Sequence, residues 1–180
     1  ISEAGRLANA SQQQAIDPQV SAWVSASAGT GKTKVLTERV LSLLLSGCPP
    51  QKILCLTFTK AAAAEMESRI FQYLGDWVIL DDKELENRLA QILGMPPEAH
   101  HMTRARRLFA KVLETPGGMH IETIHAFCQS LLRRFPLEAQ MSPHFTLVDE
   151  RDAAELLDAA KEQILAAARS GKNEVLADAL

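Results

Sequence analysis

Residues 26–33 read Ala26-Ser27-Ala28-Gly29-Thr30-Gly31-Lys32-Thr33, and this stretch decides the fold of the chain. The run Ala-Trp-Val-Ser at 22–25 comes before it and predicts a short buried strand. Apolar residues at helical spacing follow it and predict a helix over residues 32–45. A glycine-rich loop between a strand and a helix is the usual setting of a phosphate-binding loop. The order of these elements therefore predicts a nucleotide site within an α/β fold.

The residue types of the loop suit the triphosphate end of a nucleotide. Gly29 and Gly31 permit the tight backbone curl that turns several N–H groups toward one anion. The Lys32 ammonium would contact the β- and γ-phosphates, and the Thr33 hydroxyl would ligate Mg²⁺. The expected nucleotide contacts in the loop are therefore Ala28, Gly29, Thr30, Gly31, Lys32 and Thr33.

The loop departs at one position from the usual G-x-x-x-x-G-K-[ST] pattern, because Ala26 stands where the first glycine belongs. Alanine suits that position if the backbone there does not need a positive φ. The alternative interpretation is a turn of small residues in front of an ordinary helix.

The composition is that of a soluble globular chain, with 47% hydrophobic and 23% charged residues over 180 positions. The net charge of −3 excludes a global basic field, so any nucleic-acid contact must come from local patches. The three cysteines (Cys48, Cys55, Cys128) have no metal-ligand spacing and indicate reduced thiols in the cytoplasm. We expect no membrane-spanning segment. Because the chain starts at Ile1 and stops at Leu180 within a helical pattern, we expect it to be a piece of a longer protein.

Two further strands are predicted. The near-continuous apolar run 53–58 indicates a strand covered on both faces, and residues 119–123 indicate a second one. Thr59 is placed to cap the helix that follows the first of these strands. Helices are predicted around 11–16, over 60–74, around 85–93, over 103–113 and 124–135, and from 152 to 180 with an interruption at 170–171.

Strands that alternate with helices predict an α/β fold with a parallel sheet flanked by helices. We expect residues 1–150 to form a partial ATP-binding domain, with a helical excursion from the sheet at about 75–118. Residues 151–180 would begin a helical subdomain.

Several ordered stretches resemble one family of motor enzymes. Together with the loop, Thr57-Phe58-Thr59-Lys60-Ala61-Ala62-Ala63-Ala64-Glu65-Met66 and Thr123-Ile124-His125-Ala126-Phe127 are similar to the UvrD/Rep group of superfamily 1 DNA helicases. The loop sequence, Leu113-Glu114-Thr115-Pro116-Gly117-Gly118 and Arg133-Arg134-Phe135-Pro136-Leu137-Glu138-Ala139 resemble more closely the helicase subunit of bacterial AddAB-type helicase–nucleases. The resemblance covers about residues 7–165 and implies a RecA-like P-loop domain that uses ATP and Mg²⁺.

The resemblance assigns further nucleotide contacts. Asn9-Ala10-Ser11-Gln12 is similar to the start of the family's Q motif, which makes Gln12 the adenine contact. An amide suits this task because it donates and accepts at once. The alternative is that Gln12, Gln13 and Gln14 form a polar helix face. Lys34 comes directly after Thr33, so we expect it near the nucleotide as well.

Two stretches would contact single-stranded DNA. Residues 57–66 resemble motif Ia, in which Phe58 could stack on a base while Thr59 and Lys60 meet phosphate. Core packing is the alternative for Phe58. Thr123 and His125 resemble the next DNA-contacting motif, and a purely structural histidine is the alternative for His125.

The role of two groups of basic residues stays open. Each group could contact DNA or a partner, or it could form a solvated helix face. They are the cluster Arg104, Arg106, Arg107 and Lys111, and the pair Arg133 and Arg134.

The acidic pair that hydrolysis requires is not identified. Asp149-Glu150 precedes Arg151-Asp152 rather than the family's Gln-Asp, so we reject it.

The resemblance implies the N-terminal ATP-binding part of a DNA helicase–nuclease for double-strand-break repair, with later lobes outside this chain. It further implies single-stranded and double-stranded DNA as substrates and an AddB-type partner subunit. We expect the isolated chain to be inactive. The alternatives are a P-loop kinase or other non-helicase NTPase, and a non-catalytic nucleotide-binding or scaffolding domain.

Overall fold

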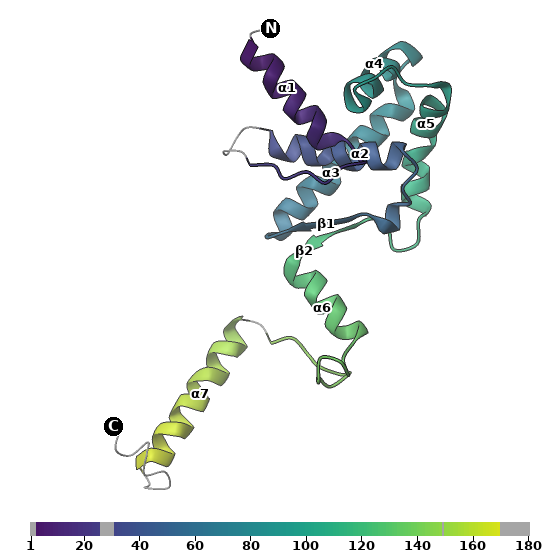
Figure 1. Ribbon diagram of the computed structural model, residues 1–180. Helices are drawn as coiled ribbons and strands as arrows, with labels where there is room; N and C mark the ends of the chain where they lie inside the picture. The colour runs from purple at the N-terminus through teal and green to yellow at the C-terminus, as the bar shows by residue number, and fades with distance from the viewer. Residues whose placement is uncertain (1–2, 26–30, 149, 170–180) are drawn as a thin grey trace. The chain divides into compact units, whose positions relative to one another are not determined.

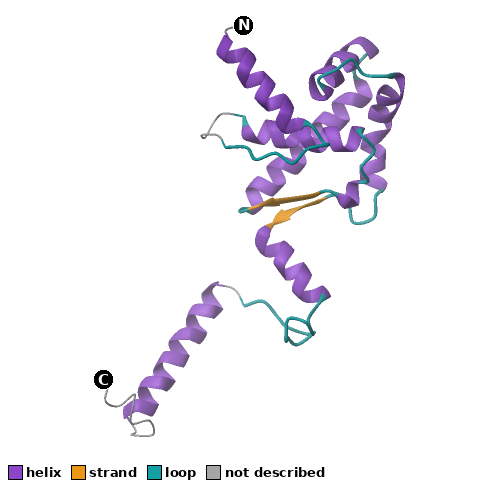
Figure 2. Ribbon diagram, in the orientation of Figure 1, coloured by secondary structure: helices purple, strands orange, loops and turns teal. Residues whose placement is uncertain are grey.

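The computed structural model describes residues 3–25, 31–148 and 150–169, which form two compact units that divide between Leu131 and Leu132. Most of the first unit is helical, with one small sheet (Figures 1 and 2). The elements are α1 Glu3–Ile16, α2 Lys32–Leu45, the 3-10 helix η1 Pro50–Lys52, β1 Leu54–Thr57, α3 Lys60–Ile79, α4 Asp82–Leu93, α5 Ala99–Glu114, β2 His120–Thr123, α6 Ile124–Arg134 and α7 Glu150–Arg169.

The sheet consists of β1 and β2, which pair in parallel from Leu54 opposite His120 to Thr57 opposite Thr123. Helices α3, α4 and α5 form the connection between the two strands (Figure 2). These findings confirm the predicted α/β fold with a parallel sheet. The expectation of a strand covered on both faces is wrong, because Leu54 and Leu56 are exposed. Helix α3 contacts both strands, and Cys55 and Thr57, which alternate with the two leucines, are half-buried.

The strand predicted at 22–25 is also wrong. Residues 21–25 have no regular secondary structure, and the Trp23 side chain is 95% exposed. A strand needs a neighbouring strand to satisfy its backbone N–H and C=O groups. Within the described residues, β1 and β2 pair only with each other.

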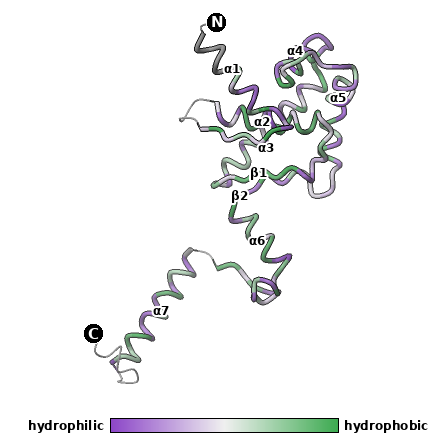
Figure 3. The backbone as a smooth tube through the Cα atoms, viewed as in Figure 1, coloured by the Kyte–Doolittle hydropathy of each residue, from purple (hydrophilic) through white to green (hydrophobic). Residues whose placement is uncertain are grey.

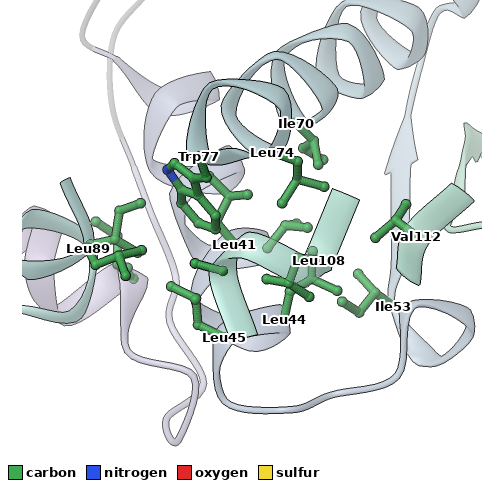
Figure 4. Packing of buried hydrophobic residues seen from close by; sticks show 14 of the residues in the cluster. Leu41, Leu44, Leu45, Ile53, Ile70, Leu74, Trp77, Leu89, Leu108 and Val112 are labelled. Atoms are coloured by element: carbon green, nitrogen blue, oxygen red, sulfur yellow. The ribbon is translucent and has the colours of Figure 1, made fainter. Parts of the chain in front are cut away.

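The core of the first unit lies between α2, α3, α4 and α5 (Figure 4). Its most deeply buried side chains include Leu41, Leu44 and Leu45 of α2, Ile70, Leu74 and Trp77 of α3, Leu85 and Leu89 of α4, and Leu108 and Val112 of α5. The predicted excursion at 75–118 is therefore helical as expected, but it supplies much of the core. Helix α3 continues five residues past its predicted end at Leu74, because Trp77 is buried with the other core residues.

Two members of the basic cluster on α5 have structural roles that neither alternative foresaw. Arg104 donates to the carbonyl oxygen of Leu45 at the end of α2. Arg106 donates through one nitrogen to three carbonyl oxygens at the end of α3, and through the other to Asp82 at 2.7 Å. Both residues therefore satisfy carbonyl groups that a helix leaves unpaired at its C-terminus. Only Arg107 and Lys111 of this cluster are exposed.

The second unit contains the end of α6 and helix α7. The predicted helix is confirmed over 152–169, whereas its expected interruption at 170–171 and its continuation to 180 lie outside the described residues. Hydrophobic and hydrophilic residues alternate along α7 (Figure 3). Arg133 and Arg134 are exposed in the last turn of α6. None of the helices described has the length and apolar character needed to cross a membrane.

The buried position of α4 leads to a prediction about stability. Leu89 is fully buried and Leu113 is 60% exposed. We expect Leu89→Ala to lower the free energy of unfolding by about 2–5 kcal/mol, because the change leaves a cavity in the core. The matched change Leu113→Ala should alter it by less than about 1 kcal/mol. Urea denaturation followed by circular dichroism measures both values, and equal effects would show that α4 is peripheral.

Candidate functional site

Helix α2 begins at Lys32, as predicted, directly after a left-handed residue. Gly31 has φ 84° and ψ 18°, a conformation that L-residues with a side chain adopt at a cost. A Cβ atom at Gly31 would meet nothing within 4 Å, so the requirement for glycine is conformational rather than steric. Residues 26–30 lie outside the described residues, and the contacts expected of Ala28, Gly29 and Thr30 stay predictions.

The first turn of α2 is suited to an anion. It contains no acidic residue, and no side chain caps its described N-terminus. Among the described residues, no carboxylate of this turn and no capping side chain therefore occupies the N–H groups at the positive end of the helix dipole. Lys32 is half-buried and Thr33 is exposed on this turn, and the Thr37 hydroxyl donates to the Thr33 carbonyl oxygen at 2.8 Å.

A pocket of about 640 Å³ lies beside this turn. The end of α1, residues 17–25 and the start of α2 form its walls, and Figure 1 shows these segments together. Gln12 of α1 and Lys32 of α2 both line it, and the buried Ala15 and Val35 add apolar surface. The structure thus brings together two residues that the sequence assigned separately, one to a base and one to phosphates.

The three glutamines of α1 do not form one solvated face. Gln12 and Gln14 line the pocket, whereas the Gln13 amide donates to the carbonyl oxygen of Ile92 at 3.0 Å and so connects α1 to α4. The structure therefore gives Gln12 and Gln13 different surroundings, although they are adjacent in sequence.

Lys34 is not among the residues that line the pocket. Its Nζ lies 3.7 Å from Oε1 of Glu38, one turn further along α2. Burial raises the pKa of the Glu38 carboxyl, and the attraction of Lys34 opposes that shift. The role of Lys34 near a nucleotide stays a prediction.

A second group of predicted residues lies where the two strands end. Because Thr57 is opposite Thr123 in a parallel pair, the segments that follow each strand begin at one edge of the sheet. The Thr59 hydroxyl oxygen accepts from the Ala62 N–H at 3.1 Å, which confirms the predicted cap of α3. The Thr123 hydroxyl oxygen accepts from the Ala126 N–H at the same distance. Both threonines thus fix the start of a helix at this edge.

Three exposed side chains accompany these threonines. Phe58 is 84% exposed, so it does not pack in the core. Lys60 and His125 are also exposed, and in the part of the chain that the structure describes the His125 side chain forms no hydrogen bond or ion pair. The edge therefore presents an aromatic face, an ammonium group and an imidazole together. Such a set can stack on a base and contact phosphates.

Comparison with known proteins connects both groups of residues to one family. Over residues 8–180 the chain matches the family described as UvrD/REP helicase N-terminal domain. It belongs to this family. The resemblance seen in the sequence is thereby confirmed. The UvrD/REP match extends across the loop, the edge of the sheet where β1 and β2 end (the strand edge) and the helices between them.

Curated relatives of this UvrD/REP domain are named as the A component of an ATP-dependent helicase/nuclease. The protein from Lactobacillus johnsonii is 39% identical over 134 residues, which is 74% of this chain and 9% of the relative. The one from Lactobacillus gasseri is 36% identical over 171 residues, covering 93% of this chain and 12% of the relative. The one from Pelotomaculum thermopropionicum is 32% identical over 157 residues, covering 86% and 11%. The chain therefore spans about a tenth of the length of these relatives.

One residue beside the pocket was missed by sequence reasoning. Arg39 of α2 donates to the carbonyl oxygens of Ala15, Asp17 and Val20, three residues that line the pocket. A single arginine on an amphipathic helix carries no sequence signal for such a role, because its acceptors are backbone atoms about 20 residues away.

The two glycines Gly31 and Gly75 give a matched test of the loop conformation. A Cβ atom would meet nothing within 4 Å at either, but only Gly31 has a positive φ. We expect Gly31→Ala to lower the free energy of unfolding by about 1–2 kcal/mol. Gly75→Ala, within α3, should raise it by about 0.5–1 kcal/mol. Urea midpoints of the two variants decide the matter, and a stabilising Gly31→Ala would contradict the left-handed conformation.

Proposed function

We propose that this chain is the N-terminal ATP-binding part of an ATP-dependent DNA helicase–nuclease that acts in double-strand-break repair. The observation that carries the proposal is the shared pocket of Gln12 and Lys32 at the uncapped start of α2. Membership of the UvrD/REP family and the helicase/nuclease names of its relatives support it. On this proposal, ATP hydrolysis is coupled to movement along single-stranded DNA in the cytoplasm, where bacterial DNA lies.

In this proposal the pocket binds ATP from its two ends. The Gln12 amide donates to and accepts from the adenine edge, which an amide can do without a change of protonation. The Gly31 backbone curl and the first turn of α2 direct N–H groups at the triphosphate. The Lys32 ammonium lies beside the β- and γ-phosphates, and the contacts of Ala28, Gly29, Thr30 and Lys34 belong to the same proposal.

Magnesium fits the residues at the start of α2. Thr33 is exposed on the same turn as Lys32, and its hydroxyl oxygen is a hard ligand of the kind that Mg²⁺ prefers. In the part of the chain that the structure describes, no group of three or more His, Cys, Asp or Glu could hold a metal ion. Thr33 and the phosphates would therefore hold the cation. When bound, Mg²⁺ neutralises charge that develops on the phosphates.

The strand edge supplies the proposed DNA contacts. Phe58 would stack on a base, and Lys60 and His125 would contact backbone phosphates, with Thr59 and Thr123 fixing the two helices that carry them. The aromatic side chain is exposed and adjacent to the first turn of α3, so a base can reach it without a rearrangement of the core.

We also propose the domain assignment and the partners. Residues 1–150 would be part of a RecA-like P-loop domain, and 151–180 the start of a helical subdomain. The whole protein would act on single-stranded and double-stranded DNA together with an AddB-type partner, as the helicase/nuclease names of the relatives suggest. Hydrolysis also needs an acidic pair and arginine side chains around the triphosphate, and the sequence of this chain does not identify that acidic pair. The isolated chain would therefore bind ATP weakly and not turn it over.

The role of Lys32 can be tested in the intact protein. We expect Lys32→Ala to reduce DNA-stimulated ATP hydrolysis at least about a hundredfold, because a charge that stabilises the transition state is lost. Lys83→Ala, on the exposed face of α4, should leave the rate unchanged. A phosphate-release assay with added single-stranded DNA measures both. Equal rates for Lys32→Ala and the unmodified protein would overturn the pocket assignment. Sustained turnover by the isolated chain would leave the pocket in place and would contradict its expected inactivity.

The strand edge can be tested by titration with single-stranded DNA at two salt concentrations. We expect Phe58→Ala to weaken binding by about 1–3 kcal/mol, the contribution of one stacked base. Ile79→Ala, an exposed apolar residue at the opposite end of α3, is the matched control and should have no effect. Binding should also weaken as salt rises. Nucleotide binding without salt-dependent DNA binding would favour a non-helicase NTPase.

A further inference from the structure

The guanidinium group of Arg39 connects α2 to the opposite wall of the nucleotide pocket. One of its terminal nitrogens donates to the carbonyl oxygens of Ala15 at 2.8 Å and Asp17 at 2.7 Å, and the other to that of Val20 at 2.6 Å. Ala15 belongs to the last turn of α1, and Asp17 and Val20 follow that helix. All three acceptors are therefore backbone atoms of the segment that leaves α1.

This segment determines where the base end of the pocket lies. Ala15, Asp17 and Val20 line the pocket, and α1 carries Gln12 one turn before its last residues. Arg39 itself is not a lining residue. Its hydrogen bonds connect it to the pocket through the backbone of three lining residues.

The phosphate end of the pocket belongs to the same helix as Arg39. Lys32 begins α2, and Arg39 lies seven residues later, which is about 10 Å along a helix axis. One rigid helix thus carries both Lys32, which contacts the phosphates, and Arg39, which holds the pocket wall on the base side. A guanidinium group is suited to bind three carbonyl oxygens at once because it is planar and always charged, and its donors point in several fixed directions.

We propose that Arg39 is a positioning residue that sets the separation between the adenine-contacting Gln12 and the phosphate-contacting Lys32. Because Arg39 holds Gln12 where it can contact the base, a nucleotide gains a base contact in addition to its phosphate contacts. The pocket therefore prefers a nucleotide over a bare triphosphate. This inference rests on the function proposed above.

Arg106 is a matched control, because it also binds three carbonyl oxygens at the end of a helix. Arg106 donates to the carbonyl oxygens of Trp77, Val78 and Leu80 at 2.9, 3.1 and 2.6 Å, at the C-terminal end of α3. It does not line the nucleotide pocket. Loss of either arginine leaves three carbonyl groups without their donor, so both changes should lower stability, but only one should affect nucleotide preference.

The experiment measures two affinities of the intact protein in the presence of Mg²⁺, one for a non-hydrolysable ATP analogue and one for inorganic tripolyphosphate. Competition calorimetry gives the ratio of the two affinities for the unmodified protein, Arg39→Gln, Arg39→Lys and Arg106→Gln. We expect Arg39→Gln to lower the ratio about tenfold, which corresponds to the loss of one or two hydrogen bonds to the base. Arg39→Lys should lower it less, and Arg106→Gln should leave it unchanged.

The outcomes separate the inference from the function on which it rests. An unmodified protein that binds the analogue no better than tripolyphosphate would overturn the proposed nucleotide pocket. A clear preference that persists in the Arg39 variants, or that falls equally in Arg106→Gln, would overturn the positioning role alone. If circular dichroism shows that Arg39→Gln does not fold, Arg39→Lys decides, because it keeps the charge but replaces the fork of donors with a single ammonium group.

Discussion

The burial of one face of α2 is the constraint on which the rest of the first unit depends. Leu41, Leu44 and Leu45 are almost completely buried, and α2 contacts α1, α3, α4 and α5. Each fully buried leucine contributes about 1.5–3 kcal/mol, so the helix is held firmly along its C-terminal half. Its N-terminal turn then has a fixed position and direction. Because this turn carries no acidic side chain, the fold holds an electropositive helix end in place beside the pocket.

Carbonyl groups at helix ends are satisfied in this unit by arginines from other helices. Arg39 serves the end of α1, Arg104 the end of α2 and Arg106 the end of α3. Each bond joins two elements that are distant in the sequence, so the arginines fix the helices relative to one another as well as capping them. Basic residues of this chain are therefore a poor guide to a nucleic-acid surface unless their backbone acceptors are known.

Local signals predicted much of the fold correctly. The bounds of α2 follow from its apolar spacing and from Gly31, the left-handed residue directly before the helix. Burial against distant elements could not be foreseen. The helix predicted over 60–74 continues to Ile79 because Trp77 is buried. The run at 22–25 has the composition of a strand but no described partner. For the candidate site, the loop pattern predicted Lys32 and the family resemblance predicted Gln12, and both line one pocket. Arg39 was missed because its acceptors are backbone oxygens.

The geometry of the sheet brings residues from two separate sequence motifs to one place. Parallel pairing of β1 with β2 places Phe58 and His125 at the same edge, although three helices separate them in the chain. Helix α3 begins at this edge with the Thr59 cap, and its middle packs on α2 through the shared core. A shift of α2 on nucleotide binding would therefore press on buried side chains of α3, because protein cores have little free space and transmit displacement. The proposed DNA edge and the proposed nucleotide pocket are thus connected by two helices in direct contact.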